Sequence, residues 1–424
     1  MKYCNNCVYP DTHPLGITFN EDGICSGCLV HREKYEIDWS IERERLTTLI
    51  DSQQEKAHPN YDCIIPIIGS GDDFFVVHYV KKTLGLNPLL VSYNSHFSTK
   101  VGIRNLARLI SKLDCEHINL TVGPDTVKNI VKTTLFSKGD IFWHIQAGLQ
   151  AFAVQVAVKL KIPLIIWGVN GWMDQVGKFS HYHKAEMSEK IWHEFSSRKL
   201  TCSSLLSLNP NLNEKDLTPF AYPNLAEIAS VNVRGIYLNN FIFWDSKTQI
   251  EEMIKLYGFE TRQEQRTFNS YETANCWVNS DLQDYLKLMK FGYSKVSDHA
   301  ARDLRLGRLN RDEAIQLIQY YENREPLSLD TFCDWLMISR TDCETLFEKF
   351  RSERVWKYDG KRWAKKRSIM ETTKNKSIIE NGSKMIDRNQ YQVTPNLETE
   401  YSGRDFLLMG RTYMNHDNFR AVEG

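Results

Sequence analysis

Four of the ten cysteines lie within the first 28 residues, in two pairs of the form Cys-x2-Cys. The pairs are Cys4 with Cys7 and Cys25 with Cys28. Each such turn presents two thiolates on one side of a tight knuckle, and two turns supply the four ligands of a closed tetrahedral zinc site. Because no coordination position is left open, the spacing predicts a structural zinc ion. Two disulfides, thiols that only pack, and an iron–sulfur cluster are the alternatives.

A glycine-rich turn follows the first apolar run, IIPII, and reads Gly69-Ser70-Gly71-Asp72-Asp73. Its glycines let the backbone turn tightly and bring N–H groups close to a phosphate, and a helix starting near Asp72 adds its positive end. It is not a Walker loop, because the segment holds no GxxxxGK[ST]. The alternative is a plain strand-to-helix turn in which Asp72 or Asp73 caps the helix.

The segment 295–308 combines a histidine with carboxylates and guanidinium groups. If it is helical, Asp298, Arg302 and Arg305 share one face, and His299 lies three residues before Arg302. Such a face is suited to a phosphate or a sugar carboxylate, because Arg offers paired donors that match both. A solvated helix with internal ion pairs is the alternative.

Other polar or aromatic residues are weaker candidates. Gly168, Asn170 and Gly171 follow the apolar run LIIW, where open α/β sheets bind ligands, although a glycine-rich turn explains them equally well. Trp244 and Asp245 are candidates for sugar stacking and hydroxyl binding. The histidine-rich positions are interpreted as substrate contacts or plain surface; they are His144, His181, Tyr182 and His183.

These residues need a scaffold, and the pattern of short apolar runs alternating with amphipathic stretches predicts one of the α/β class. The expected strands cover residues 62–68, 88–93, 117–122 and 163–168. The expected helices cover residues 74–84, 101–113, 124–135 and 146–160. The runs IIPII and LIIW are apolar throughout, as a mostly parallel sheet covered on both faces requires.

Changes in composition divide the chain into five expected regions. They are a zinc ribbon (1–35), a linking helix (36–60), a nucleotide-binding α/β domain (61–200), a mainly helical substrate or partner domain (201–365) and a polar tail (366–424). The 53 basic and 53 acidic residues cancel, so neither nucleic acid nor an anionic membrane is expected as the main partner, although a local basic patch is compatible with this balance. With no membrane span and no secretion signal visible, a cytoplasmic location is expected.

The glycine-rich turn resembles the PP-loop of ATP pyrophosphatases, whose signature is Ser-Gly-Gly-x-Asp-Ser after the first strand. Gly69 and Asp72 match, whereas Ile68, Ser70 and Asp73 replace the first Ser, the second Gly and the last Ser. The resemblance implies a PP-loop, adenine nucleotide alpha hydrolase-like sheet. Asp73 places a carboxylate where the family offers pyrophosphate a neutral donor, which requires a bridging Mg²⁺ or an altered site.

Over residues 1–365 the chain is similar to the N-acetyl sugar amidotransferases of bacterial surface polysaccharide and of pseudaminic and related nonulosonic acid pathways. The stretches that carry this resemblance are MKYCNNCVYPDT, YDCIIPIIGSGDD, NPLLVSYN, IPLIIWGVNGWMDQVG and FGYSKVSDHAARDLRLGRLNRDEAI. The resemblance implies that an acetamido group of a free or nucleotide-linked sugar becomes an acetamidino group. ATP would activate the amide as an adenylated imidate. Ammonia would come from a partner glutaminase, with a cyclase-like subunit as a further candidate partner.

The resemblance also implies a role for each candidate residue. The expected catalytic residues are Asp72, Asp298, His299 and Arg302. The expected contacts to ATP and Mg²⁺ are Gly69, Ser70, Gly71, Asp72, Asp73, Asn94, Gly168 and Asn170. The expected substrate contacts are Arg302, Arg305, Trp244 and Asp245, and the expected zinc ligands are Cys4, Cys7, Cys25 and Cys28. Two other functions remain open: a tRNA-modifying PP-loop enzyme, and a non-catalytic paralogue whose loop has degenerated.

Overall fold

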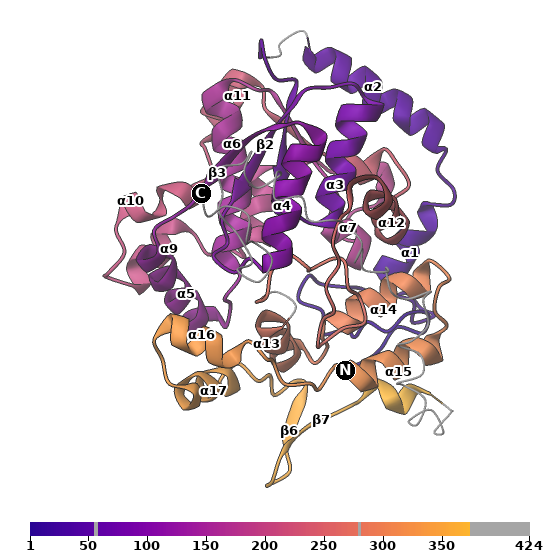
Figure 1. Cartoon of the computed structure of the whole chain (residues 1–424). Helices are drawn as coiled ribbons and strands as arrows, with labels where there is room; N and C mark the ends of the chain where they lie inside the picture. Colours follow the sequence, from indigo (N-terminus) through magenta and orange to yellow (C-terminus); the bar gives the residue numbers. More distant parts are fainter. Residues whose placement is uncertain (55–57, 279–280, 374–424) are drawn as a thin grey trace, which may run out of the picture.

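The computed structural model describes residues 1–54, 58–278 and 281–373, and its centre is a five-stranded parallel sheet of order β3-β2-β1-β4-β5 (Figure 1). The strands are β1 (Cys63–Ile67), β2 (Pro88–Tyr93), β3 (Glu116–Leu120), β4 (Leu164–Trp167) and β5 (Arg234–Tyr237). The four expected strands and the α/β class are confirmed. The fifth strand was not expected, because RGIY is short and only part of it is apolar.

Helices cover both faces of the sheet, and alternate residues of β1 show why the strand is apolar throughout. Ile65 and Ile67 pack with α3 (Gly71–His78), α4 (Lys100–Leu113) and α12 (Ser246–Tyr257). Ile64 points to the other face and packs with α6 (Trp143–Leu160). Successive side chains of a strand point to opposite faces, so a sheet covered on both sides needs apolar residues at every position.

The sheet domain extends beyond the expected boundary at residue 200. β5 pairs in parallel with β4, and α12 packs on α3, so the domain continues to Tyr257. Shorter helices connect the layers or lie between β4 and β5. They are α7 (Gly171–Val176), α8 (Glu189–Ile191), α9 (Cys202–Leu208), α10 (Glu214–Leu217) and α11 (Leu225–Val231), while the longer α5 (Pro124–Lys138) follows β3. The polar stretch around residue 210 is therefore an excursion within the sheet domain and not a linker.

The region after Tyr257 is mainly helical, as expected. An irregular segment leads into α13 (Leu282–Phe291), α14 (Lys295–Arg305), α15 (Arg311–Tyr321), α16 (Leu329–Leu336) and α17 (Arg340–Glu348). An antiparallel hairpin follows, formed by β6 (Trp356–Tyr358) and β7 (Trp363–Lys365). A short turn of 3-10 helix, Ile369–Thr372, then packs on α15. The expected tail lies outside the described residues from position 374 onwards.

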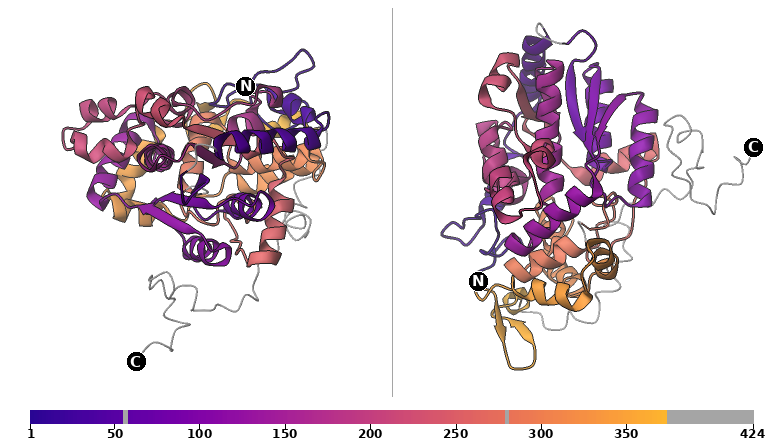
Figure 2. Two further views of the ribbon diagram at one scale, coloured as in Figure 1. Left: turned by 90° about the horizontal axis from the view of Figure 1, so that it is seen from above. Right: turned by 90° about the vertical axis from the view of Figure 1, so that its left-hand side faces the viewer.

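The N-terminal unit packs against the C-terminal helices, so the two ends of the described chain lie side by side (Figures 1 and 2). Tyr9 and Ile17 share a core with Val296 of α14 and Ile315 of α15. The chain then runs through α1 (Ser26–Glu33) and α2 (Trp39–Gln54) to the sheet. Among the described residues no single helix is long and apolar enough to cross a membrane, and only α5 with α6, bent by 120°, pass that test as a pair.

Candidate active site

The four N-terminal cysteines converge on one point. All are buried, and their Sγ atoms lie within 4.8 Å of one another, with Cys7 and Cys25 3.6 Å apart. Zn–S bonds of about 2.3 Å in a tetrahedron place sulfur atoms ~3.8 Å apart, so the group fits a single ion. A four-iron cluster is larger and holds its cysteines further apart. All ten cysteines are free, which excludes the disulfide alternative in this structure.

Arg305 of α14 belongs to this cysteine group and not to a substrate site. Its Nε lies 3.4 Å from the Sγ of Cys28, its Nη2 lies 3.6 Å from the Sγ of Cys25, and its Nη1 donates to the carbonyl of Asp174 at 2.9 Å. The expectation that Arg305 binds substrate is therefore wrong. The N-terminal unit packs on this end of α14, so the guanidinium offsets thiolate charge. A Cβ on Gly27 would lie 2.4 Å from its Nη2, which explains the glycine.

The turn after β1 is closed by its own side chains. Ser70 is the N-cap of α3 and accepts a hydrogen bond from the N–H of Asp73 at 3.3 Å. In return, the Asp73 carboxylate accepts from the N–H groups of Ile68 (2.7 Å) and Ser70 (2.9 Å). The N-cap is thus Ser70, and neither Asp72 nor Asp73. The Asp73 carboxylate therefore occupies two backbone N–H groups that would otherwise be available to a phosphate. Gly69 adopts φ 84°, which permits the turn.

A cleft of about 520 Å³ lies in front of this turn, between the sheet domain and the C-terminal helices. Ser70 and Asp72 line it from the sheet side, while Asp298, His299 and Arg302 of α14 line the other. The structure therefore brings together all four residues expected to be catalytic. The segment 295–308 is helical from Lys295 to Arg305, so the condition under which Asp298, Arg302 and Arg305 share one face is met. Further lining residues include Gly171, Trp172, Gln175, Arg198, Glu272, Lys287, Lys290 and Lys295.

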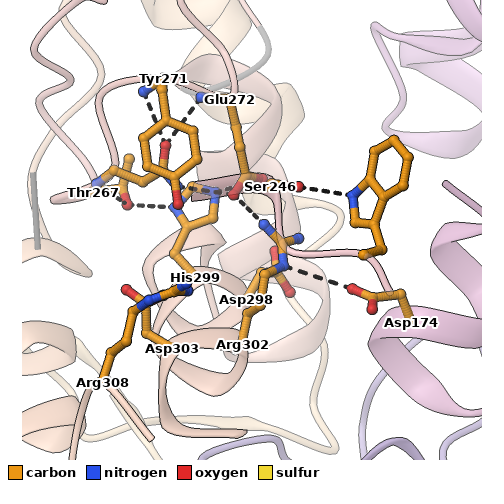
Figure 3. Close-up of polar contacts among 12 residues, drawn as sticks. Asp174, Ser246, Thr267, Tyr271, Glu272, Asp298, His299, Arg302, Asp303 and Arg308 are labelled. Atoms are coloured by element: carbon orange, nitrogen blue, oxygen red, sulfur yellow. Dashed lines mark hydrogen bonds and ion pairs between the residues drawn. The ribbon is translucent and has the colours of Figure 1, made fainter. Parts of the chain in front are cut away.

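Glu272 connects the polar groups of α14 (Figure 3). It forms an ion pair with Arg302 and lies 3.3 Å from Nε2 of His299, whose Nδ1 is 2.6 Å from the hydroxyl of Thr267. The Nε of Arg302 also lies 3.6 Å from a carboxylate oxygen of Asp174. Burial raises the pKa of Glu272, but Arg302 and His299 outweigh burial and hold that pKa below its ordinary value. The carboxylate therefore stays ionised and holds His299 and Arg302 at the cleft wall.

Asp72 is an acid of the cleft whose proton is poised near neutral pH. Burial, followed by the charge of Glu272, raises its pKa to about 7. One of its carboxylate oxygens, Oδ1, is buried without a hydrogen-bond partner. An unpartnered buried carboxylate oxygen beside a phosphate-binding turn is a suitable ligand for Mg²⁺, which takes oxygen ligands and brings phosphates with it.

Lysines make the floor of the cleft positive. Lys287 forms an ion pair with Asp298 and lies over the ring of Tyr293 at 4.3 Å. Lys290 donates to the carbonyl of Lys138 at 2.7 Å, and burial lowers its pKa to about 8. Burial also lowers the pKa of Lys295. This floor suits an anionic ligand, because the attraction between a cation and an anion is stronger where both are partly shielded from water.

A second cavity of about 260 Å³ opens beside the carboxyl ends of β1 and β2. Asn94 lines it, as expected of a residue that faces a nucleotide, and its side-chain oxygen accepts from the N–H of His96 at 3.1 Å. Ile68 and Phe142 line both this cavity and the cleft. The two spaces therefore meet at the turn 68–73, with room for a base on one side and phosphates on the other.

Trp244 and Asp245 do not reach either cavity, so their expected role in sugar binding is wrong. Trp244 is 3% exposed, packs edge-on against Phe75 at 5.5 Å and donates to the hydroxyl of Ser246 at 3.0 Å. Asp245 forms an ion pair with Arg308. Both precede α12: Trp244 lies in the core beside α3, and Asp245 is partly exposed in its ion pair.

Three expected nucleotide contacts have structural roles instead. Asn170 is fully buried, and its side chain caps α7 by accepting from the N–H of Met173 at 3.3 Å. A Cβ on Gly168 would lie 3.1 Å from Val76, and one on Gly71 would lie 2.6 Å from the side chain of Ile250. These glycines allow close packing. Gly171 does line the cleft, where a Cβ would meet open space.

The histidine-rich positions lie apart from both cavities. His144 is buried beside the hydroxyl of Tyr93 at 3.0 Å, and His181 is buried; burial lowers the pKa of each to about 3, so both are neutral. Tyr182 is exposed, and His183 accepts from the N–H of Ser180 at 3.2 Å. The interpretation as plain surface therefore holds for Tyr182 and His183, whereas both interpretations are wrong for His144 and His181, which lie in the core.

Several lining residues were missed from the sequence, chiefly Glu272, Trp172 and Lys290. Glu272 lies in the irregular segment between α12 and α13, where no periodicity marks one residue above its neighbours. Trp172 is the exception, since it directly follows the glycine-rich turn after β4, at the end of the sheet where ligands bind.

Comparison with known proteins identifies part of the chain. Residues 265–370 match the family model of the C-terminal domain of WbpG-like LPS biosynthesis proteins, so the resemblance to surface polysaccharide enzymes is confirmed for this part. No curated protein matches. Two similar solved structures are an NMN synthetase from Francisella tularensis (16% identity, 52% of this chain and 94% of that one, TM-score 0.27) and an NH3-dependent NAD synthetase from Campylobacter jejuni (15%, 48% and 93%, TM-score 0.26).

Proposed function

We propose that this chain, whose C-terminal part is WbpG-like, is an ATP-dependent amidotransferase that converts an acetamido group of a bacterial surface sugar into an acetamidino group. The observation that carries the proposal is the cleft, in which Ser70 and Asp72 of the glycine-rich turn face His299 and Arg302 of α14. ATP at the turn and a sugar against α14 would then share one cleft.

The reaction needs two displacements. The amide oxygen attacks the α-phosphorus of ATP, pyrophosphate leaves, and the amide becomes an adenylated imidate. Ammonia then attacks the imidate carbon, AMP leaves with the former amide oxygen, and loss of a proton gives the amidine. The base of ATP is assigned to the cavity at Asn94, and Mg²⁺, which would neutralise the phosphates, to the free oxygen of Asp72.

The residues of α14 orient the substrate and stabilise charge. Arg302 faces the cleft as a donor matched to a phosphate or carboxylate, and Lys287, Lys290 and Lys295 add positive charge behind it. His299, held by Glu272 and Thr267, is positioned to exchange a proton with ammonia or the imidate. Zn²⁺ in the cysteine group would fix the N-terminal unit against α14.

The ammonia source is assigned to a separate glutaminase, with a cyclase-like protein as a further partner. The chain's cysteines support this assignment, because four form the N-terminal group, four more are buried, and burial raises the thiol pKa of the other two, Cys115 and Cys202. A thiol nucleophile for glutamine hydrolysis needs a base beside it in an accessible site.

The test uses the purified chain with ATP, Mg²⁺, ammonium ion and a panel of acetamido sugars, free and nucleotide-linked. The proposal predicts a product in which NH replaces one oxygen, with one AMP and one pyrophosphate formed for each product molecule. Arg302→Lys should lower the rate about 100-fold, because a bidentate contact is lost. ATP cleavage without change in any sugar, or ADP as the nucleotide product, would contradict it.

One observation favours a second candidate, a non-catalytic paralogue. The Asp73 carboxylate occupies amides that a phosphate would need. In that case the cleft would bind the sugar alone. Titration with the sugar in the absence and presence of ATP and Mg²⁺ separates the two functions, because only the enzyme binds both ligands.

A further inference from the structure

The β6–β7 hairpin concentrates positive charge in a chain whose formal charges cancel. Residues 349–367 hold nine Lys or Arg but only two Asp or Glu. Seven of these cations are exposed: Lys349, Arg354, Lys357, Lys361, Arg362, Lys366 and Arg367. The hairpin projects from the body of the protein (Figures 1 and 2). Such a local excess is the electrostatic signature of a contact with an anionic surface.

The hairpin is held in shape although it projects. At its base, Trp356 donates to the carbonyl of Met289 at 2.8 Å, and Lys365 forms a buried ion pair with Glu322 at 2.6 Å. At its turn, the Asp359 carboxylate accepts from the N–H groups of Lys361 and Arg362, at 3.0 and 2.9 Å. The cations are therefore presented on a preformed tip, and little ordering entropy is lost when that tip binds.

Two aromatic rings accompany the cations. Tyr358 and Trp363 form a cross-strand pair with ring centroids 5.3 Å apart, and they are 57% and 39% exposed. Trp and Tyr favour the interface between lipid headgroups and hydrocarbon, where the ring is apolar and its polar atom is hydrated. Lys and Arg beside them attract anionic headgroups. Exposed aromatics and cations together match a phospholipid surface.

The shape of the tip argues against a nucleic acid. Proteins that bind single strands stack successive bases on separate rings along a charged groove. Here the two rings pack on each other, and the cations lie on both strands and in the turn of a projecting hairpin. We propose that the β6–β7 hairpin docks this protein peripherally on membrane surfaces that carry anionic phospholipid.

The test is sedimentation of the full chain with phosphatidylcholine vesicles that contain or lack phosphatidylglycerol. Wild type should bind only the anionic vesicles and be released by salt. The variant K357E/K361E/R362E should bind about 100-fold more weakly, since each cation near such a surface contributes about fivefold. K112E/K159E/K215E, the same charge change at exposed lysines elsewhere, should bind like wild type. Y358A/W363A should bind about tenfold more weakly.

Several results would overturn this proposal. They are wild type that stays in solution with anionic vesicles, equal binding to neutral vesicles, or equal loss of binding in the hairpin and control variants. Binding of a single-stranded oligonucleotide without binding of vesicles would also overturn it. If the charge-reversal variant misfolds, K357Q/K361Q/R362Q should still lose vesicle binding while it melts at the wild-type temperature.

Discussion

The carboxylate of Asp73 lies 2.7 Å from the backbone nitrogen of Ile68, whose N–H it accepts. The same oxygen accepts from the N–H of Ser70 at 2.9 Å, so an internal anion sits where the turn after β1 offers its donors. A nucleotide phosphate that uses these donors must displace this carboxylate. ATP binding at these amides therefore requires the side chain of Asp73 to rotate away.

Replacing Asp73 by serine should strengthen ATP binding. The substitution removes the competing carboxylate and leaves a neutral donor, so the dissociation constant for ATP with Mg²⁺ should fall about tenfold. The loss of the capping box should lower the free energy of unfolding by about 1 kcal/mol. Calorimetric titration measures the first effect and denaturant unfolding the second.

The control is Asp51→Ser, which removes an exposed carboxylate of α2 far from the turn. It should leave the ATP affinity unchanged. If Asp73→Ser binds ATP no better than this control does, phosphates do not use the amides of Ile68 and Ser70.

Asp72→Asn should stabilise the protein above neutral pH and weaken nucleotide binding. The pKa of Asp72 is raised from 3.8 to about 7, so the native state holds this proton more tightly than the unfolded state does. Its ionisation therefore costs stability that develops as pH rises from 3.8 to about 7 and stays constant above. The asparagine variant should gain roughly 1–3 kcal/mol there and nothing at low pH.

Denaturant unfolding across this pH range tests the stability effect. In wild type, binding of ATP with Mg²⁺ should also strengthen as pH rises through about 7, because the ionised carboxylate is the metal ligand, and the variant should lose this dependence. A stability difference that does not change with pH would contradict the raised pKa.

Arg305→Met should weaken metal binding. The guanidinium lies near the Sγ atoms of Cys28 and Cys25, and its loss leaves thiolate charge without a partner, which should lower zinc affinity about 10–100-fold. Arg308→Met, three residues further on, removes a cation that pairs with Asp245 instead. Zinc retained per chain after dialysis against a graded chelator should fall for Arg305→Met alone. Equal retention in both variants would show that Arg305 does not support the metal.

Substitutions of Trp244 and Trp172 should have different effects, the first on stability and the second on ligand binding. Trp244→Ala should lower the free energy of unfolding by about 3–5 kcal/mol, because it empties a core site beside Phe75. Trp172 lines the cleft and is partly exposed, so Trp172→Ala should cost less stability but weaken sugar binding. Trp244→Phe should keep the sugar affinity. A loss of sugar binding in Trp244→Phe would show that Trp244 does contact the sugar.

The parts of the fold that depend on local patterns were predictable. IIPII and LIIW mark strands because they are continuous apolar runs of mostly buried residues, and Cys4, Cys7, Cys25 and Cys28 mark a ligand group because the two cysteines of each Cys-x2-Cys turn must lie close. The mainly helical character of the region that carries Asp298 and Arg302 was also expected from the sequence.

The contacts between distant segments were not predictable in the same way. Arg302 and Arg305 lie on the same face of α14, so their spacing does not distinguish them. Only the packing of the N-terminal unit on α14 places Arg305 beside the cysteines, while Arg302 lies at the cleft. The burial of Trp244 against Phe75 of α3 likewise depends on the packing of distant segments. Glu272 lies in an irregular segment, whose path is set by tertiary contacts and not by sequence period.

The most direct test of the account is a crystal structure of the chain with Mg²⁺ and a non-hydrolysable ATP analogue. We expect the base in the cavity beside Asn94, the phosphates at the amides of Ile68 and Ser70, a metal ion on Asp72, and the Asp73 carboxylate rotated out of the turn. A turn that still holds Asp73, with that cavity empty at saturating nucleotide, would contradict it.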